Sequence, residues 1–136
     1  MPQRNAASAY QSQAVQTASQ PQILVMLCDR FMLDLRRAKE SIEKNDFQEA
    51  NESLQHAQKI TRMLRTSLDP KGFKGGQELL AIYLFLERHL VKANLEKNGT
   101  VVEECEQVFS PICEAWRMAV ANSETRESKD AVANVG

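Results

Sequence analysis

The residue types that most often carry chemistry are scarce in this chain. Its histidines are His56 and His89, which lie on different predicted helices and lack the Glu-x-x-His spacing of metal sites in helical bundles. Cys28 follows no motif that activates a thiolate, while Cys105 and Cys113 suit a helix as small apolar residues. The sequence therefore predicts no catalytic residues, no metal site and no cofactor, and we expect a protein that is not an enzyme.

A glycine-rich stretch, KGFKGG at 71–76, precedes a predicted helix, and such a stretch can bind phosphate through backbone N–H groups. It lacks the preceding strand and the Lys-Ser/Thr ending of a P-loop, so a flexible connector is the favoured interpretation. The basic residues Arg36, Arg37 and Lys39 are balanced by Asp34, Glu40 and Glu43, as on a solvated helix face. We expect no nucleic-acid partner.

Composition limits the remaining possibilities. The 136 residues are 43% hydrophobic, which suffices for one compact domain, and 17 basic against 18 acidic residues give a net charge of −1. An odd number of cysteines without paired spacing, and a start without a secretory signal pattern, favour the reducing cytoplasm. The longest apolar run, 79–86, is too short to span a bilayer, so we expect no membrane insertion.

Apolar residues recur at three- and four-residue steps in four segments, 21–44, 47–68, 77–97 and 101–122. Short connectors between them predict an all-α, antiparallel up-down-up-down four-helix bundle. We expect a flexible segment at 1–16 that is either disordered or docked on the bundle, the bundle itself at 17–122, and a disordered tail at 123–136.

Local signals mark the ends of these segments. Asp46 with Glu49, and Thr100 with Glu103, have the spacing of capping boxes. Pro111 interrupts the fourth segment and predicts a kink, because it removes a helical hydrogen bond.

The segment 77–97 carries apolar residues on two sides. One stripe suits a bundle core and consists of Leu79, Ile82, Tyr83, Leu86, Leu90 and Ala93. The other consists of Leu80, Leu84, Val91 and Leu95. Charged residues interrupt this helix too often for burial on all sides, so the second stripe predicts a binding groove, with homodimerisation as the alternative. Met26 and Leu33 lie behind the core stripe of the first segment in the same way.

Short motifs follow one another in a fixed order over residues 9–122. They are Ala9-Tyr10 with Val15, Thr17 and Ala18; Met26-Leu27-Cys28-Asp29; Ala50-Asn51 with Leu54, Ala57 and Ile60; Ile82-Tyr83-Leu84 with Leu90, Ala93 and Asn94; and Ala115-Trp116. Their order and spacing resemble the flagellin-specific export chaperones called FliS. Cys28 stands where that family usually has Tyr, and Arg30 stands where Gly is common.

The resemblance implies a cytoplasmic four-helix bundle that binds the disordered C-terminal segment of flagellin, prevents its premature polymerisation and delivers it to the flagellar export gate. It also implies that Tyr10 docks on the bundle and gives way to the client. With the apolar stripes, this predicts the partner-binding residues Tyr10, Met26, Leu33, Leu80, Leu84, Val91 and Leu95. We expect a monomer or weak homodimer. The alternative is a homo-oligomeric structural or adaptor bundle without a flagellin client.

Overall fold

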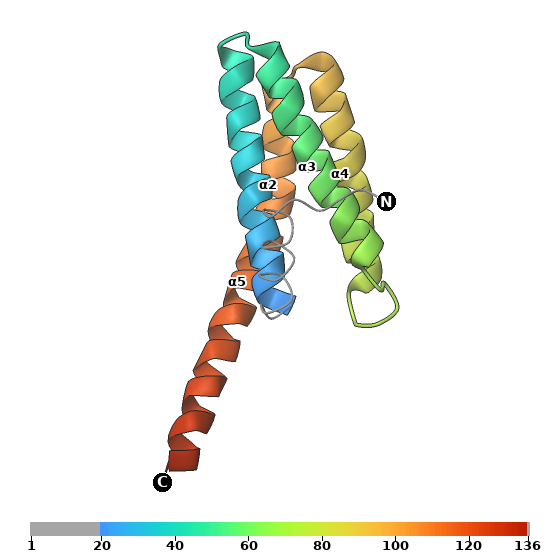
Figure 1. The fold of residues 1–136 in the computed structure, drawn as a ribbon. Coiled ribbons are helices and arrows are strands. Elements are labelled where there is room, and N and C mark those ends of the chain that lie inside the picture. The colour runs from blue at the N-terminus through green and yellow to red at the C-terminus, as the bar shows by residue number, and fades with distance from the viewer. Residues whose placement is uncertain (1–19, 136) are drawn as a thin grey trace, which may run out of the picture. The chain divides into compact units, whose positions relative to one another are not determined.

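The computed structural model describes residues 20–135, and within that range it contains helices and no strand. Four helices follow one another along the chain (Figure 1), namely α2 (Gln20–Glu43), α3 (Phe47–Ser67), α4 (Gly76–Glu96) and α5 (Gly99–Val135). Neighbouring helices alternate in direction, which confirms the predicted all-α antiparallel bundle. None of the described helices combines the length and apolar composition that crossing a membrane would require. Tyr10 and the rest of the predicted segment 1–16 lie outside the described residues.

The chain divides into two compact units, residues 27–112 and a second unit formed by residues up to Met26 together with those from Cys113 onward. The first unit holds most of α2, all of α3 and α4, and the start of α5. Its cross-helix side-chain pairs are Asp34–His56 between α2 and α3, Arg65–Glu87 between α3 and α4, His89–Glu104 between α4 and α5, and Lys39–Glu106 between α2 and α5. These pairs connect α2 to α3, α3 to α4, α4 to α5 and α5 back to α2. The helices α2 and α4 therefore stand at opposite corners of this unit.

Aromatic side chains fill the centre of the first unit. Phe31 of α2 meets Phe109 of α5 edge to face, with ring centroids 4.9 Å apart, and Tyr83 of α4 lies 6.4 Å from Phe109. All three are buried, and burial raises the pKa of Tyr83 well above its usual range. Each such aromatic pair adds about 0.5–1.5 kcal/mol beyond the burial of its area. The cluster joins α2, α4 and α5 and fixes which side of each helix faces inward.

In the second unit, α5 continues beyond Asn122, where the apolar pattern fades, as far as Val135. Residues 123–135 contain Ala, Glu, Arg and Lys but no Gly or Pro, so their intrinsic propensity allows the helix to continue. Pro111 lies inside α5, which neither ends nor restarts there, although the proline cannot donate to the carbonyl of Gln107. The predicted segment boundaries at residues 16 and 122 stay predictions.

The helix ends show which capping signals operate. Asp46 accepts a hydrogen bond from the backbone N–H of Glu49 at 3.2 Å, whereas the N–H of Asp46 donates to the carbonyl of Ser41 at 2.8 Å. Only half of the predicted capping box therefore forms. At the start of α5, the carboxamide oxygen of Asn98 accepts from the N–H of Thr100 at 3.0 Å. The predicted cap at Thr100 is wrong, because Asn98 precedes the first turn and takes that role.

The connector between α3 and α4 forms a defined turn. The carboxylate of Asp69 accepts from the N–H of Lys71 at 3.2 Å, and its carbonyl accepts from the N–H of Gly72 at 3.0 Å. Gly75 has a φ of 90°, which favours glycine. A Cβ on Gly76 would lie only 2.3 Å from the carbonyl oxygen of Pro70. Gly76 is therefore buried against the turn, and the backbone there leaves no room for a side chain.

This contact makes Gly76 a sensitive position. Gly76→Ala should lower the free energy of unfolding by about 1–3 kcal/mol, because the new methyl group must push backbone atoms apart. The measurement is urea denaturation followed by far-ultraviolet circular dichroism.

Gly99→Ala is the matched control, since nothing lies within 4 Å of a Cβ at Gly99. That variant should be neutral or stabilised by up to about 1 kcal/mol, because alanine restricts the unfolded chain. Equal stability of the two variants would contradict the proposed close contact.

Candidate functional site

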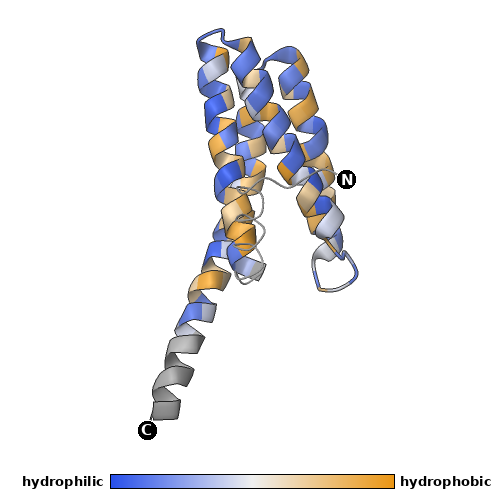
Figure 2. Cartoon of the chain, in the orientation of Figure 1, coloured by the Kyte–Doolittle hydropathy of each residue, from blue (hydrophilic) through white to orange (hydrophobic). Residues whose placement is uncertain are grey.

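The second apolar stripe of α4 lies on the surface of the bundle. Leu84 is 40% exposed, Val91 45% and Leu95 82%, while Leu80 is half-buried. Tyr83, Leu86 and Leu90 of the same helix are buried in the core. The helix α4 therefore has one buried side and one exposed side. Figure 2 shows hydrophobic residues recurring along α4. We call Leu80, Leu84, Val91 and Leu95 the α4 stripe.

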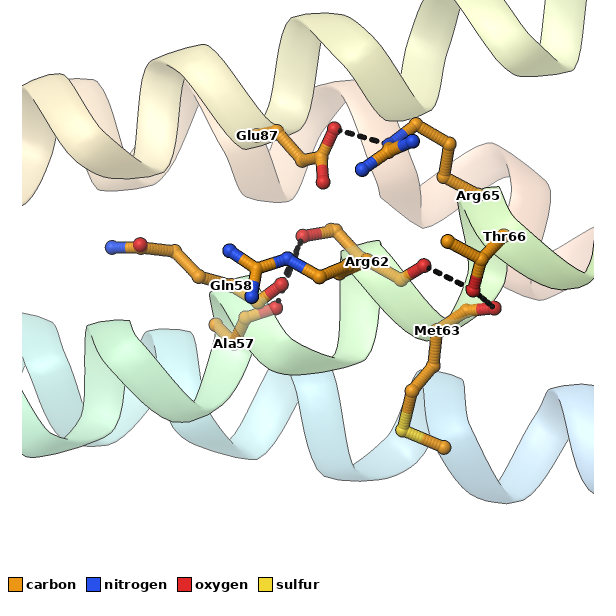
Figure 3. Close-up of polar contacts among 8 residues, drawn as sticks. Ala57, Gln58, Arg62, Met63, Arg65, Thr66 and Glu87 are labelled. Atoms are coloured by element: carbon orange, nitrogen blue, oxygen red, sulfur yellow. Dashed lines mark hydrogen bonds and ion pairs between the residues drawn. The ribbon is translucent and has the colours of Figure 1, made fainter.

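Polar pairs join α3 to α4 alongside the α4 stripe. The guanidinium of Arg65 donates to Glu87 at 2.7 Å (Figure 3), and the amide of Asn94 donates to the carboxamide oxygen of Asn51 at 2.8 Å. Both members of the ion pair are partly exposed, at 33% and 23%, so it contributes about 1 kcal/mol or less. Its more important effect is on charge, because Glu87 lies next to the α4 stripe by helical spacing and is neutralised by Arg65.

The side of α3 that borders the α4 stripe is polar. Gln55, Gln58, Arg62 and Thr66 follow one another at three- and four-residue steps and share a face with Arg65. The Thr66 hydroxyl donates to the carbonyl of Arg62 at 2.9 Å, so it is already satisfied within its own helix (Figure 3). The surface thus places an apolar helix face beside a polar one.

The other predicted partner-binding residues do not join this surface. Leu33 is half-buried on α2, at the corner of the first unit opposite α4. Met26 is 51% exposed and belongs to the second unit. Tyr10 lies outside the described residues. Among the seven predicted residues, the structure brings together the four on α4.

Several exposed apolar residues were not predicted. Phe47, which opens the apolar pattern of the predicted segment 47–68, is 46% exposed because it is the first residue of α3, directly after the capping Asp46. Met63 of α3 and Phe73 of the connector are also about half exposed, at 54% and 52%. Apolar periodicity alone cannot reveal that Phe47 is exposed, because it does not show where the neighbouring helices end.

Asp34 contradicts the prediction of a solvated helix face on α2. Its side chain is 2% exposed and receives the guanidinium of Arg30 at 3.2 Å and the imidazole Nδ1 of His56. A cavity of about 290 Å³ adjoins them and is lined further by Arg37, Glu49, Glu52 and Ser53. A buried carboxylate is tolerated only when it is paired, so His56 acts as a structural partner that joins α3 to α2.

The free thiol of Cys105 has low chemical reactivity. Cys105 is buried, and burial together with the nearby carboxylates of Glu104 and Glu106 raises its pKa to about 12. Because the thiolate is the nucleophile, this cysteine is inert near neutral pH. Among the described residues, no three His, Cys, Asp or Glu side chains group as metal ligands would.

The buried thiol leads to a labelling prediction. In the native protein at about pH 8, iodoacetamide should leave Cys105 unmodified, and urea should make it react fully. Mass spectrometry of the peptide containing Cys105 measures both, with Cys105→Ala as the control for assignment. Since the folded pKa of about 12 exceeds the ordinary 9.0, this thiol favours folding below pH 9.0, and the contribution falls as pH rises toward 12. Equal labelling of native and unfolded protein would contradict the assignment.

Comparison with known proteins places the chain in a family. The family model described as "Flagellar protein FliS" matches residues 3–123. The chain is 37% identical over 106 residues to the flagellar secretion chaperone FliS of Escherichia coli (strain K12), covering 76% of this chain and 78% of that protein. It is 29% identical over 117 residues to the FliS of Bacillus subtilis (strain 168), covering 86% of this chain and 87% of that protein.

A third relative, the FliS of Salmonella typhimurium (strain LT2), is 33% identical over 120 residues, covering 85% of this chain and 87% of that protein. The fold also matches a solved structure described as a flagellar chaperone from bacteria, with a TM-score of 0.71. That comparison covers 87% of this chain and 99% of the other at 17% identity, so it supports the fold alone.

The all-helical fold and these relatives identify the chain as a helical secretion chaperone. The chain belongs to the FliS family of flagellar secretion chaperones.

Proposed function

We propose that this chain binds the disordered C-terminal segment of flagellin in the cytoplasm, keeps it from polymerising prematurely and delivers it to the flagellar export apparatus. The observation that carries the proposal is the α4 stripe, where Leu84, Val91 and Leu95 are 40%, 45% and 82% exposed. Membership of a family of secretion chaperones supports a secreted client. Flagellin is the client that the resemblance to the FliS family implies.

The α4 stripe suits an occupant that is helical when bound. From Leu80 to Leu95 the stripe extends about 22 Å at 1.5 Å per residue, the length of a helix of roughly 15 residues. An amphipathic helix would place its apolar face on the α4 stripe and its polar edge along Gln58 and Thr66 of α3. This is helix-in-groove recognition, in which anchors recur at three- and four-residue steps.

The area available on α4 also indicates how much it can contribute. Burying the exposed parts of Leu84, Val91 and Leu95 yields roughly 5–7 kcal/mol at about 25 cal/mol per Å² of apolar area. Association itself costs at least about 4 kcal/mol, so this area alone supports only weak binding. A client that binds more tightly must contact further surfaces, and the exposed Met26 and half-buried Leu33 are the predicted candidates.

The α4 stripe provides the main test of client binding. Leu84→Glu and Val91→Glu should each weaken binding of the flagellin C-terminal segment at least tenfold, about 1.4 kcal/mol, because a carboxylate replaces an apolar contact. The measurement is isothermal titration, with circular dichroism to show that helicity is retained.

Gln107→Glu, at an exposed position of α5, adds the same charge away from the α4 stripe and should leave binding unchanged. If the α4 variants lose their helicity instead of their affinity, Leu84 and Val91 contribute to folding and the surface assignment is wrong.

The N-terminal segment offers a second test. We propose that Tyr10 covers apolar bundle surface when no client is bound and that the client displaces it. Deleting residues 1–16 should then tighten client binding, because competition is removed, and lower solubility, because apolar surface is uncovered. Titration and light scattering measure the two effects. Unchanged affinity together with unchanged solubility would contradict this role.

A second copy of the chain is the alternative occupant, since an exposed apolar stripe also suits a homo-oligomer. Light scattering with and without the flagellin C-terminal segment separates the two possibilities. A chaperone should form a complex of defined stoichiometry with the segment. A structural oligomer should keep its mass when the segment is added.

A further inference from the structure

The α4 stripe has a border of basic side chains. Arg88 and Lys92 are exposed on α4, one helical turn apart, along the edge of the stripe that faces away from α3. Arg62 is exposed on α3 along the opposite edge. We call these three residues the cationic rim. Their position is informative because the whole chain has a net charge of only −1.

Two acidic residues near this surface are already paired. Glu87, which adjoins the α4 stripe, is bound to Arg65 at 2.7 Å. Glu104 of α5 lies 3.3 Å from the imidazole of His89. In the described part of the chain, the ion pairs include no carboxylate that neutralises Arg62, Arg88 or Lys92. The exposed Glu96, one helical turn from Lys92, is a single carboxylate beside three basic side chains, so the rim keeps a net positive charge beside exposed apolar surface.

We propose that the cationic rim selects client helices whose apolar face is flanked by acidic residues. This inference rests on the proposed function and adds to it the charge pattern of the client. Arg88 and Lys92 match two carboxylates one turn apart on one edge of the bound helix, and Arg62 matches a carboxylate on its other edge. Exposed pairs of this kind each change affinity by up to about fivefold, and together they decide between clients of equal apolar content.

The same rim disfavours a second copy of the chain. In a two-fold symmetric dimer, the same patch meets itself, so α4 stripe on α4 stripe would bring the cationic rim of one copy against the cationic rim of the other. Like charges at the edge of an apolar contact oppose association. The cationic rim thus distinguishes an acidic client from self-association, although both could cover the α4 stripe.

The test uses the full chain and three synthetic helical peptides that share one leucine pattern. The leucines are flanked by Glu in the first peptide, by Gln in the second and by Lys in the third. At low ionic strength, the Glu-flanked peptide should bind at least tenfold more tightly than the Lys-flanked one, measured by fluorescence anisotropy. In concentrated salt the difference should shrink to less than about threefold, because exposed charges are screened.

Charge reversal then assigns the preference to named residues. The double variant Arg88→Glu with Lys92→Glu should reverse the order of the Glu- and Lys-flanked peptides, and Arg88→Gln with Lys92→Gln should remove most of the difference. The control Lys71→Glu with Lys74→Glu changes the net charge equally but acts in the exposed α3–α4 connector. It should keep the wild-type order. Circular dichroism checks that all variants are folded.

Binding of the flagellin C-terminal segment is measured in parallel, so that the two proposals fail separately. If flagellin binds but the peptides bind equally well, or the Arg88 and Lys92 variants keep the wild-type order, the cationic rim has no selective role. If the Glu-flanked peptide is preferred but flagellin does not bind, the rim is supported and the flagellin client is wrong. Failure of every peptide to bind would overturn the rim proposal.

Discussion

The contact of Phe31 and Tyr83 with Phe109 is the constraint on which the rest of the structure depends. These rings join α2, α4 and α5 at the centre of the first unit, with centroid separations of 4.9 and 6.4 Å to Phe109. Once Tyr83 points inward, the rotation of α4 about its axis is fixed. Leu84 and Val91 must then face away from the core, because at about 100° per residue they cannot share its inward side. The α4 stripe is a geometric consequence of the aromatic core.

Polar pairs then set the position of α3 along that surface. Asn51 with Asn94, and Arg65 with Glu87, hold α3 beside α4 at hydrogen-bond distances of 2.8 and 2.7 Å. They add little stability at their partial exposure, yet they determine which α3 side chains border the α4 stripe. A surface suited to an amphipathic occupant therefore needs both the apolar core and these weak polar contacts. The first orients α4, and the second completes its surroundings.

Much of this architecture could be predicted from the sequence, because helix periodicity depends on neighbouring residues alone. The four helices follow from the spacing of apolar residues along the chain. The two-sided character of α4 follows from the spacing of its leucines. Asp34 could not be predicted in the same way, since its burial depends on Arg30 and on His56 from another helix. The exposure of Phe47 could not be predicted for a related reason, because a residue in the first turn can continue an apolar pattern beyond the end of the core.

The double use of α4 leaves this helix few positions that can change without effect during evolution. Substitutions at Tyr83, Leu86 or Leu90 disturb the core, and Asn94 holds the contact to Asn51. The exposed side adds further constraints wherever it meets a partner. On α2, by contrast, Arg36 and Glu40 are exposed outside the pairs that join the helices, and sequence can drift there. Divergence among related chains should thus accumulate unevenly, slowly along α4 and faster on the outer side of α2.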